Sequence, residues 1–309
     1  MTRMTASTSA IRVAAPATTA NLGPGYDCLG MALDIWNTVE VEPLAAGEAS
    51  SVLVSGEGEG ELEAGQENLV YRSMEFLCRE MGRELPPVRV SCSNEIPLAR
   101  GLGSSAAAIA GGLVAANALL GGGFSQRDLL EMAATIEGHP DNVAAAVTGG
   151  LQLVVTEENT LYTVPVSIPA AMHVVLYIPD RRISTADARS VLPLQLPVAD
   201  AVHNMSRVAL LVAGMATNHP EYLDIATQDR LHQPYRQPLF PAMKLLMKAA
   251  RDAGALGAFL SGSGSTVLAL TQGREMTVAY EMAEAARQAA VEGMVKVTQP
   301  TALGAHLLS

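Results

Sequence analysis

The fold of this chain is decided at one stretch, Pro97-Leu98-Ala99-Arg100-Gly101-Leu102-Gly103-Ser104-Ser105-Ala106-Ala107. It predicts a strand end, a glycine–serine turn and the start of an alanine-rich helix. Gly101 and Gly103 permit a positive φ and a close approach of the backbone to a ligand. Ser104 and Ser105 stand where a helix N-cap is expected. The following helix would present free N–H groups and the positive end of its dipole to an anion. A plain strand–helix connection without a ligand is the alternative.

This stretch differs from a Walker-type phosphate loop, because no lysine follows Gly103. The chain has three lysines, and all of them come late, at Lys244, Lys248 and Lys296. An anion bound here would therefore be held by backbone dipoles, hydroxyl groups and Arg100.

The composition is that of a globular protein large enough for two domains. The chain has 309 residues, of which 49% are apolar and 17% charged. Its formal charge of −11 argues against a surface for nucleic acid or an anionic membrane. The segment from Gly101 to Gln126 carries no charge. We expect it to form a buried helix rather than a membrane span.

The cysteines and the N-terminus indicate a cytoplasmic protein. Cys28, Cys78 and Cys92 are odd in number and show no C-x-x-C spacing, which argues against a disulfide framework or structural zinc. The first ten residues lack the apolar segment of a signal peptide, so we expect none.

Strands and helices are mixed in an order that indicates an α+β fold in both halves. Strands are predicted at 11–17, 34–43, 51–55, 88–93, 151–156, 160–166, 172–178, 257–261, 265–271, 293–298 and 303–308. Helices are predicted from Asn68 to Gly82, from Ser104 onward, and at 125–136, 140–149, 184–192, 198–216, 241–253 and 275–290. Residues 57–66 read as a solvated loop. The domain boundary is predicted to separate residues 1–168 from 169–309.

Two further glycine-marked segments accompany the first stretch. They are Pro16-Ala-Thr-Thr-Ala-Asn-Leu-Gly-Pro-Gly-Tyr-Asp27 and Leu260-Ser-Gly-Ser-Gly-Ser-Thr266. Each alone is a weak signal, but together and in this order the three resemble the signatures of the GHMP kinase superfamily. Ser265 is a departure, because the superfamily usually has proline there, and it predicts a less rigid turn.

Four segments narrow the resemblance to the homoserine kinase family, over about residues 12–304. They are Asn21-Leu-Gly-Pro-Gly-Tyr-Asp27, Glu137-Gly-His-Pro-Asp-Asn142, Ser184-Thr-Ala-Asp-Ala-Arg189 and His232-Gln-Pro-Tyr-Arg236. The resemblance implies a two-domain GHMP kinase fold. Its N-terminal domain would bind ATP and contain a left-handed βαβ unit, and its C-terminal domain would be a ferredoxin-like α/β sandwich.

The activity implied by the resemblance is the ATP-dependent phosphorylation of the L-homoserine hydroxyl, a step of threonine biosynthesis. ATP would lie across residues 97–107, with its adenine near Asn68. The glycine-marked segment 260–266, the third loop, would contribute Ser261, Gly262, Ser263 and Gly264. Mg²⁺, which prefers oxygen ligands, would be held by Glu137 and by either Ser104 or Ser105. A solvated acid at a helix end is the other interpretation of Glu137. A homodimer is implied by the resemblance alone.

The substrate site implied by the resemblance would bind an amino acid. Arg189 and Arg236 would bind its carboxylate, because a guanidinium offers a planar pair of donors. Asp27 would bind its ammonium group. The resemblance places four more residues around the reacting hydroxyl: Asn21, His139, Asn142 and Thr185. Ordinary roles stay open, since Pro140-Asp141 is a common helix start and Arg189 could lie on the surface.

The general base is the open point of the chemistry. Asp141 stands near the position of the catalytic aspartate of related sugar and mevalonate kinases. The resemblance instead gives the contact with the hydroxyl to Asn142, which cannot accept the proton. A loose transition state needs little deprotonation of the nucleophile beforehand, so we expect no dedicated base. Two rival functions stay open: a kinase of the mevalonate type, and a catalytically silent sensor of ATP and a metabolite.

Overall fold

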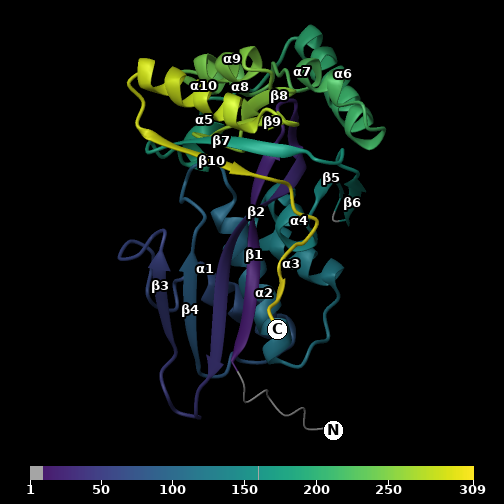
Figure 1. Ribbon diagram of the computed structural model, residues 1–309. Coiled ribbons are helices and arrows are strands. Elements are labelled where there is room, and N and C mark those ends of the chain that lie inside the picture. Colours follow the sequence, from purple (N-terminus) through teal and green to yellow (C-terminus); the bar gives the residue numbers. More distant parts are fainter. Residues whose placement is uncertain (1–9, 159) are drawn as a thin grey trace.

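The computed structural model describes residues 10–158 and 160–309, which form two domains stacked one on the other (Figure 1). The residues on which the expected absence of a signal peptide rests, 1–9, lie outside the described part of the chain.

The N-terminal domain combines a mixed sheet with four helices. Its elements are β1 (Ile11–Asn21), β2 (Gly25–Pro43), β3 (Ser51–Gly56), α1 (Leu69–Glu80), β4 (Val88–Asn94), α2 (Ser104–Leu119), α3 (Gln126–Glu137), α4 (Pro140–Thr148), β5 (Leu151–Glu157) and β6 (Thr160–Val166). The sheet has the order β11-β1-β2-β4-β3, and the hairpin β5–β6 joins it at β2. β3 and β4 pair in parallel and are linked through α1, as the βαβ unit implied by the resemblance requires.

β1 and β2 carry the segment Pro16–Asp27, the first motif in chain order, into the C-terminal domain. Both strands extend beyond the predicted ranges of 11–17 and 34–43, and in Figure 1 the purple ribbon rises from the N-terminal domain to the C-terminal one. The extension was missed because its Ala-Thr run is almost fully buried and shows no alternation of apolar and polar residues. The turn between the two strands is thereby placed among loops of the C-terminal domain.

The core of the N-terminal domain depends on close packing around α2. This helix is buried on nearly every side, which explains its uniform Ala, Gly and Leu composition. A Cβ at Gly112 would lie 2.5 Å from the Val70 carbonyl oxygen of α1, so a side chain there would force the helices apart. α2 ends at Leu119, and no helix within the described residues is long and apolar enough to cross a membrane.

The C-terminal domain has the ferredoxin-like topology. Its elements are β7 (His173–Pro179), α5 (Thr185–Ser190), α6 (Val198–Ala216), η1 (Pro220–Tyr222), α7 (Leu223–Ala226), α8 (Gln233–Arg236), α9 (Met243–Asp252), β8 (Gly257–Leu260), β9 (Val267–Thr271), α10 (Glu275–Gln288) and β10 (Gly293–Thr298). Its antiparallel sheet has the order β10-β7-β9-β8. Short helices η1, α7 and α8 were not predicted, because three or four residues show no helical period.

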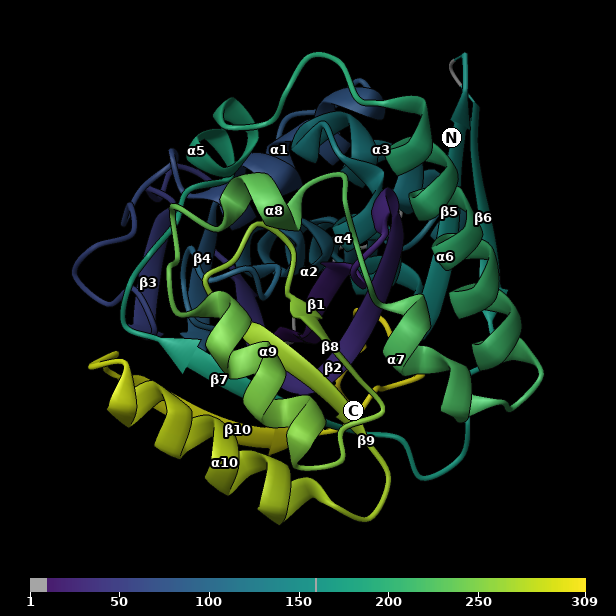
Figure 2. The same ribbon diagram turned by 90° about the horizontal axis from the view of Figure 1, so that it is seen from above.

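Alternation along β7 divides the core of this domain between the two sheet faces. Val174, Leu176 and Ile178 pack toward the N-terminal domain. Val175 and Tyr177 pack beneath the helices on the other face, α9 and α10, which Figure 2 shows over the sheet. Because successive side chains of a strand point to opposite faces, this one strand contributes to both layers. The domains therefore share a continuous apolar contact.

The end of the chain returns to the N-terminal domain. The predicted strand 303–308 is present as the short β11 (His306–Leu307), which pairs with β1. The Ala305 amide also donates to the Ala146 carbonyl oxygen at 2.7 Å. The boundary at residue 168 stays a prediction.

Candidate active site

A cavity of about 580 Å³ lies where loops of both domains meet. Most predicted site residues line it: Asn21, Asp27, Asn68, residues 97–105, Ala107, Glu137, His139, Asp141, Asn142, Thr185, Arg189, Arg236, Gly262 and Ser263. Three predicted residues are outside the lining. Ala106 is fully buried in α2, and Ser261 and Gly264 shape the third loop, where the Ser261 hydroxyl donates to the Gly101 carbonyl oxygen at 2.6 Å.

The N-terminus of α2 opens on this cavity without a side-chain cap. The expected cap at Ser104 or Ser105 is wrong, because Gly103 is the N-cap residue, with φ of 68°, and the two serines begin the helix. α1 and α3 are capped by Asn68 and Ser125. The first turn of α2 also has no acidic residue. The N–H groups and dipole at this end are thus available to an anion from the cavity.

Glycine is required at both turns of this loop. A Cβ at Gly101 would lie 2.0 Å from the Ser261 carbonyl oxygen, and a Cβ at Gly103 would lie 1.9 Å from the Thr18 hydroxyl oxygen. The Thr18 amide also donates to the Leu102 carbonyl oxygen at 3.0 Å. The three glycine-marked motifs are consequently packed backbone against backbone.

Arg100 anchors the loop to the end of β7. Its Nε donates to the Pro179 carbonyl oxygen at 2.8 Å, its Nη1 to that of Leu98 at 3.0 Å and its Nη2 to that of Asp180 at 3.2 Å. These contacts account for the orientation of the guanidinium, and its role as an anion ligand stays a prediction.

Ser265 makes a contact that proline could not make. Its side chain is fully buried, and its hydroxyl donates to the Arg181 carbonyl oxygen. The hydroxyl thus ties the third loop to the segment after β7, although whether the turn is less rigid stays a prediction.

Glu137 and Ser105 form an oxygen pair beside the start of α2. The Ser105 hydroxyl donates to Glu137 Oε1 at 2.6 Å. Burial raises the pKa of Glu137, and the hydrogen bond from Ser105 opposes this rise. Ser104 lines the same cavity. A carboxylate with neighbouring hydroxyl groups is a donor set that suits Mg²⁺, which keeps several waters and binds nucleotide phosphates together with few protein ligands. No group of three or more His, Cys, Asp or Glu side chains that could form an all-protein metal site occurs in the described residues.

The N-terminus of α4 also faces the cavity, and it carries its own acid. Asp141 is 3% exposed and accepts a hydrogen bond from the Asn142 amide at 2.8 Å. Burial raises the pKa of Asp141 to about 6, against the lowering effect of that hydrogen bond. Asn142 Oδ1 accepts from the Thr18 hydroxyl at 2.8 Å. Thr18 therefore connects this helix end with Gly103 at the start of α2.

Arg189 lies against the predicted ammonium-binding residue. Its Nη2 donates to Asp27 Oδ1 at 2.7 Å, and its Nη1 donates to Asp27 Oδ2 at 3.0 Å. Nη1 also contacts the Tyr26 hydroxyl at 2.7 Å. Asp27 itself is held by its amide, which donates to Asn21 Oδ1 at 3.1 Å. The Arg189 side chain is 32% exposed, so it remains partly at the surface while it pairs with Asp27.

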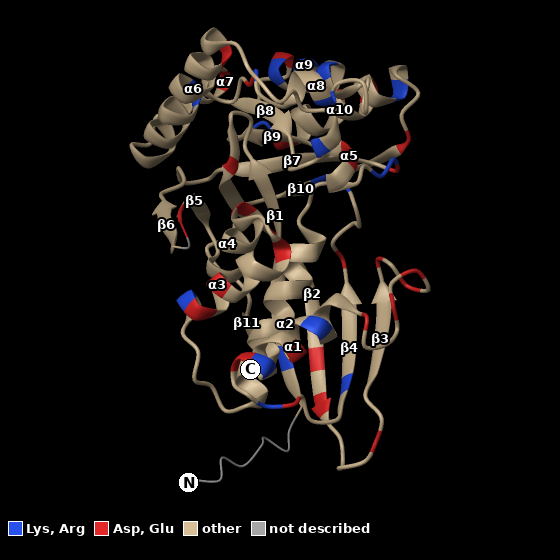
Figure 3. Ribbon diagram, turned by 180° about the vertical axis from the view of Figure 1, so that it is seen from behind, with Lys and Arg blue, Asp and Glu red and all other residues tan. Residues whose placement is uncertain are grey.

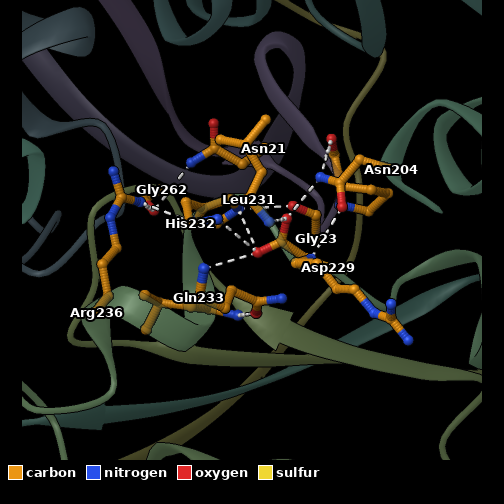
Figure 4. Close-up of polar contacts among 12 residues, drawn as sticks. Asn21, Gly23, Asn204, Asp229, Leu231, His232, Gln233, Arg236 and Gly262 are labelled. Atoms are coloured by element: carbon orange, nitrogen blue, oxygen red, sulfur yellow. Dashed lines mark hydrogen bonds and ion pairs between the residues drawn. The ribbon is translucent and has the colours of Figure 1, made fainter. Parts of the chain in front are cut away.

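Arg236 is buried and reaches the cavity from α8 (Figure 4). Its Nε donates to the Ala188 carbonyl oxygen at 3.0 Å, and its Nη1 donates to that of Gly262 at 2.8 Å. The Gly262 oxygen also accepts from Asn21 Nδ2 at 3.0 Å. Burial lowers the pKa of Arg236, but an arginine side chain stays protonated in proteins. Two guanidinium charges and one carboxylate thus gather at one wall of the cavity.

The other predicted residues have simpler surroundings. Asn68 caps α1 by accepting from the Val70 amide at 3.0 Å. His139 precedes α4 as its N-cap residue without a side-chain capping bond. Thr185 is the exposed first residue of α5. The loop 57–66, expected to be solvated, is acidic in Figure 3 and also reaches the cavity through Glu61, Leu62 and Glu63.

Comparisons with known proteins agree with this geometry. The GHMP kinase N-terminal domain matches residues 68–150, and the GHMP kinase C-terminal domain matches residues 206–290. A homoserine kinase of Moorella thermoacetica is 44% identical over 96% of this chain and 99% of its own length. One from Synechocystis is 42% identical over 91% of this chain and 92% of its own length. The chain belongs to the homoserine kinase family.

Solved structures support the family and its fold. A crystal structure of homoserine kinase from Cytophaga hutchinsonii has a TM-score of 0.87 and 31% identity, and the match covers 100% of this chain and 99% of that one. Mevalonate kinase from L. major, with a TM-score of 0.69 at 14% identity over 96% and 97% of the two chains, shares the fold. The GHMP kinase fold expected from the motifs is confirmed.

Three residues behind the cavity lining make contacts that no sequence motif reveals. Thr18 lies inside the first motif, but its role depends on Asn142, 124 positions away. Tyr26 lies between two guanidinium groups, 5.4 Å from that of Arg189 and 5.5 Å from that of Arg236. His232 was quoted in a motif without a role. Only its burial beside Arg236 reveals one.

Proposed function

We propose that this member of the family transfers the γ-phosphoryl group of ATP to the side-chain hydroxyl of L-homoserine, forming O-phospho-L-homoserine. One observation carries the proposal. Asp27, Arg189 and Arg236 gather in the same cavity as the uncapped start of α2. A substrate with both an ammonium and a carboxylate group matches the first set, and a nucleotide phosphate matches the second.

On the nucleotide side, residues 97–107 and the third loop would surround the phosphates. Backbone N–H groups and the helix dipole of α2 would stabilise the charge on the transferred group, because they are oriented before the reaction and need no rearrangement. Adenine would lie near Asn68, beside the start of α1. Arg100 would act by holding the loop in place.

Mg²⁺ is proposed beside Glu137, with Ser105 or Ser104 as its second protein ligand. The oxygen donors described above fit the ion. Bound there with ATP, it would neutralise charge on the phosphates. Glu137 would balance the ion's charge, and the 2.6 Å contact with Ser105 would keep its carboxylate pointed toward the cavity.

On the acceptor side, Asp27 would receive the ammonium group and the two arginines the carboxylate. Substrate binding would then replace the bidentate Arg189–Asp27 pair, with Asp27 contacting the ammonium group and Arg189 the carboxylate. Asn21 would hold Asp27 and Gly262 in position, since its side chain contacts both. His139 and Thr185 would border the reacting hydroxyl.

Asn142 would orient the reacting hydroxyl without taking its proton. Its Oδ1 already accepts from the Thr18 hydroxyl, and its backbone N–H donates to Asp141 Oδ1. In a loose transition state the proton can leave late, to the transferred phosphate. Asp141 would act by supporting the start of α4, and a role as general base is the alternative.

An ADP-release assay tests the proposal. Purified protein is given ATP, Mg²⁺ and, in turn, L-homoserine, L-serine, L-threonine, mevalonate or galactose. We expect release to require homoserine and Mg²⁺. Equal or faster turnover with mevalonate or galactose would contradict the substrate. ATP binding without turnover on any acceptor would favour a sensor.

A cytoplasmic location and a homodimer are further proposals. The location is supported by the three free cysteines, Cys28, Cys78 and Cys92. The dimer rests on the resemblance, and light scattering of the purified protein at several concentrations tests it.

A further inference from the structure

A buried polar network behind Arg236 has no part in the proposed function so far (Figure 4). Asp229 lies at the centre of this network, and its side chain is 0% exposed. Asp229 accepts from the amides of His232 at 3.0 Å and Gln233 at 2.7 Å, and from Asn204 Nδ2 at 2.7 Å. A buried carboxylate with this many donors is a rigid support. It holds α8 at a defined distance from α6.

The next member, His232, has its two ring nitrogens in different surroundings. Its Nε2 lies 2.6 Å from the Gly23 carbonyl oxygen, which can only accept, so Nε2 carries the proton. Its Nδ1 lies 3.2 Å from Arg236 Nη1, which can only donate, so Nδ1 is the acceptor. Burial lowers the pKa of His232 to about 4. The neutral ring in this tautomer satisfies both contacts.

These contacts determine which part of Arg236 remains for a ligand. Nε is bound to Ala188, and Nη1 is shared between Gly262 and His232. Nη2 has no hydrogen-bond partner among the described residues. Ala188 precedes Arg189, so the same contact also ties Arg236 to the helix that carries the other arginine.

We infer that His232 is a positioning residue, which accepts from Arg236 Nη1 and thereby directs Nη2 toward the substrate carboxylate. This inference rests on the proposed function. It differs from a purely structural role, because a structural role would only require that the core near Gly23 stay filled. A positioning role requires an acceptor at the location of Nδ1.

Two isosteric variants separate these roles. The amide of asparagine reaches the location of Nδ1, so His232→Asn keeps an acceptor for Arg236 and loses the donor to Gly23. The amide of glutamine reaches the location of Nε2, so His232→Gln keeps the donor and loses the acceptor. Steady-state kinetics are measured for both variants with homoserine and with ATP, and nucleotide affinity is measured by calorimetry.

We expect His232→Gln to raise the KM for homoserine about tenfold or more, since a hydrogen bond to a charged group is lost. His232→Asn should recover most of that loss, and the nucleotide affinity of both should stay within about twofold of wild type. Equal losses in the two variants, or a larger loss in His232→Asn, would overturn the inference. If the wild type itself shows no turnover with homoserine, the proposed function fails instead.

A measurement on the wild type keeps the test independent of variant folding. In ¹⁵N NMR of labelled protein, the buried histidine should show a protonated Nε2 and an unprotonated Nδ1 at neutral pH. Assignment follows from the loss of the signal in either variant that folds, or from the contact of Nε2–H with Gly23. A protonated Nδ1 would overturn the inference, because it could not accept from Arg236.

Discussion

The two helices whose N-termini face the cavity, α2 and α4, differ in the charge of their first turns. Neither helix has a side-chain cap. α2 begins with Gly103, Ser104 and Ser105 and carries no acid in its first turn. α4 begins with Pro140 and carries buried Asp141 in its first turn. The first end leaves its positive dipole to an external anion, and the second compensates its dipole internally. Under the proposed function, the nucleotide phosphates would lie at the start of α2 and the acceptor hydroxyl at the start of α4.

The largest expected effect lies on the acceptor side. Arg189→Ala or Arg236→Ala should lower kcat/KM for homoserine about 30- to several-thousand-fold, because the substrate carboxylate loses a charged partner in a partly desolvated site. Lysine should recover only part of this, and least at Arg236, where Nε and Nη1 hold two carbonyl oxygens. ATP affinity should be unchanged. Arg127→Ala, which removes an exposed pair with Glu131, is the control.

The double variant Arg189→Ala/Arg236→Ala sharpens this prediction. Partners in one site couple, so the combined loss should be smaller than the sum of the single losses in free energy. Independent losses, or an equal loss of ATP binding, would mean that the arginines do not form a common carboxylate site.

The next largest effect is expected on the nucleotide side of the cavity, at Glu137. Glu137→Gln keeps the shape of the side chain and removes the charge proposed to face Mg²⁺, so turnover should fall roughly 10²–10³-fold. Glu131→Gln, an exposed site on the same helix, is the matched control. The KM for homoserine should change little. Near wild-type turnover of a folded Glu137→Gln at low Mg²⁺ would return Glu137 to the role of an ordinary helix-end acid.

A glycine pair at the two ends of α2 separates backbone strain from crowding. Gly103 and Gly122 have φ of 68° and 79°, but only Gly103 has a neighbour, the Thr18 hydroxyl oxygen, at 1.9 Å from an added Cβ. Both alanine variants should lose about 1–2 kcal/mol of stability from the left-handed backbone. Only Gly103→Ala should also lower kcat/KM for ATP, by about 10² as the loop is displaced. Thermal unfolding and kinetics of the pair check this, and equal kinetics would argue against a phosphate site at α2.

The smallest catalytic effect is expected at Asp141. Asp141→Asn should lower turnover by less than about tenfold, whereas a general base would give 10²–10⁴-fold. Steady-state kinetics at saturating substrates decide between the two outcomes, provided that homoserine binding is unchanged.

The stability of the same variant should depend on pH in a defined direction. Burial raises the pKa of Asp141 to about 6, so the folded chain binds this proton more tightly than the unfolded chain. The associated stability is present below about pH 4 and is lost as pH rises through 6. Asp141→Asn should therefore gain on the wild type between pH 4 and pH 7, by up to about 3 kcal/mol. Urea unfolding of both proteins at pH 4 and pH 7 tests this prediction. The same difference in unfolding free energy at the two pH values would contradict it.

Several local elements of the fold were predictable from the sequence. Asn68 and Ser125 as helix caps, the helix 198–216 and the hairpin 151–166 follow from caps and periodicity within a few residues. The cap of α2 was misplaced by one or two residues, because serine usually leads at such a position. Gly103 replaces it where the Thr18 hydroxyl leaves no room for a Cβ. That crowding comes from a strand about 85 positions earlier, which no local pattern contains.

The sequence by itself determined the three glycine-marked motifs, the family resemblance and most of the predicted residues that line the cavity. Tertiary structure alone decided what each side chain does there. Arg100 holds carbonyl oxygens, Arg189 meets Asp27, and His232 accepts from Arg236. The physical reason is that a motif specifies donors and acceptors, whereas their partners depend on distance and burial. Those are set only when β1 and β2 carry the first motif into the C-terminal domain.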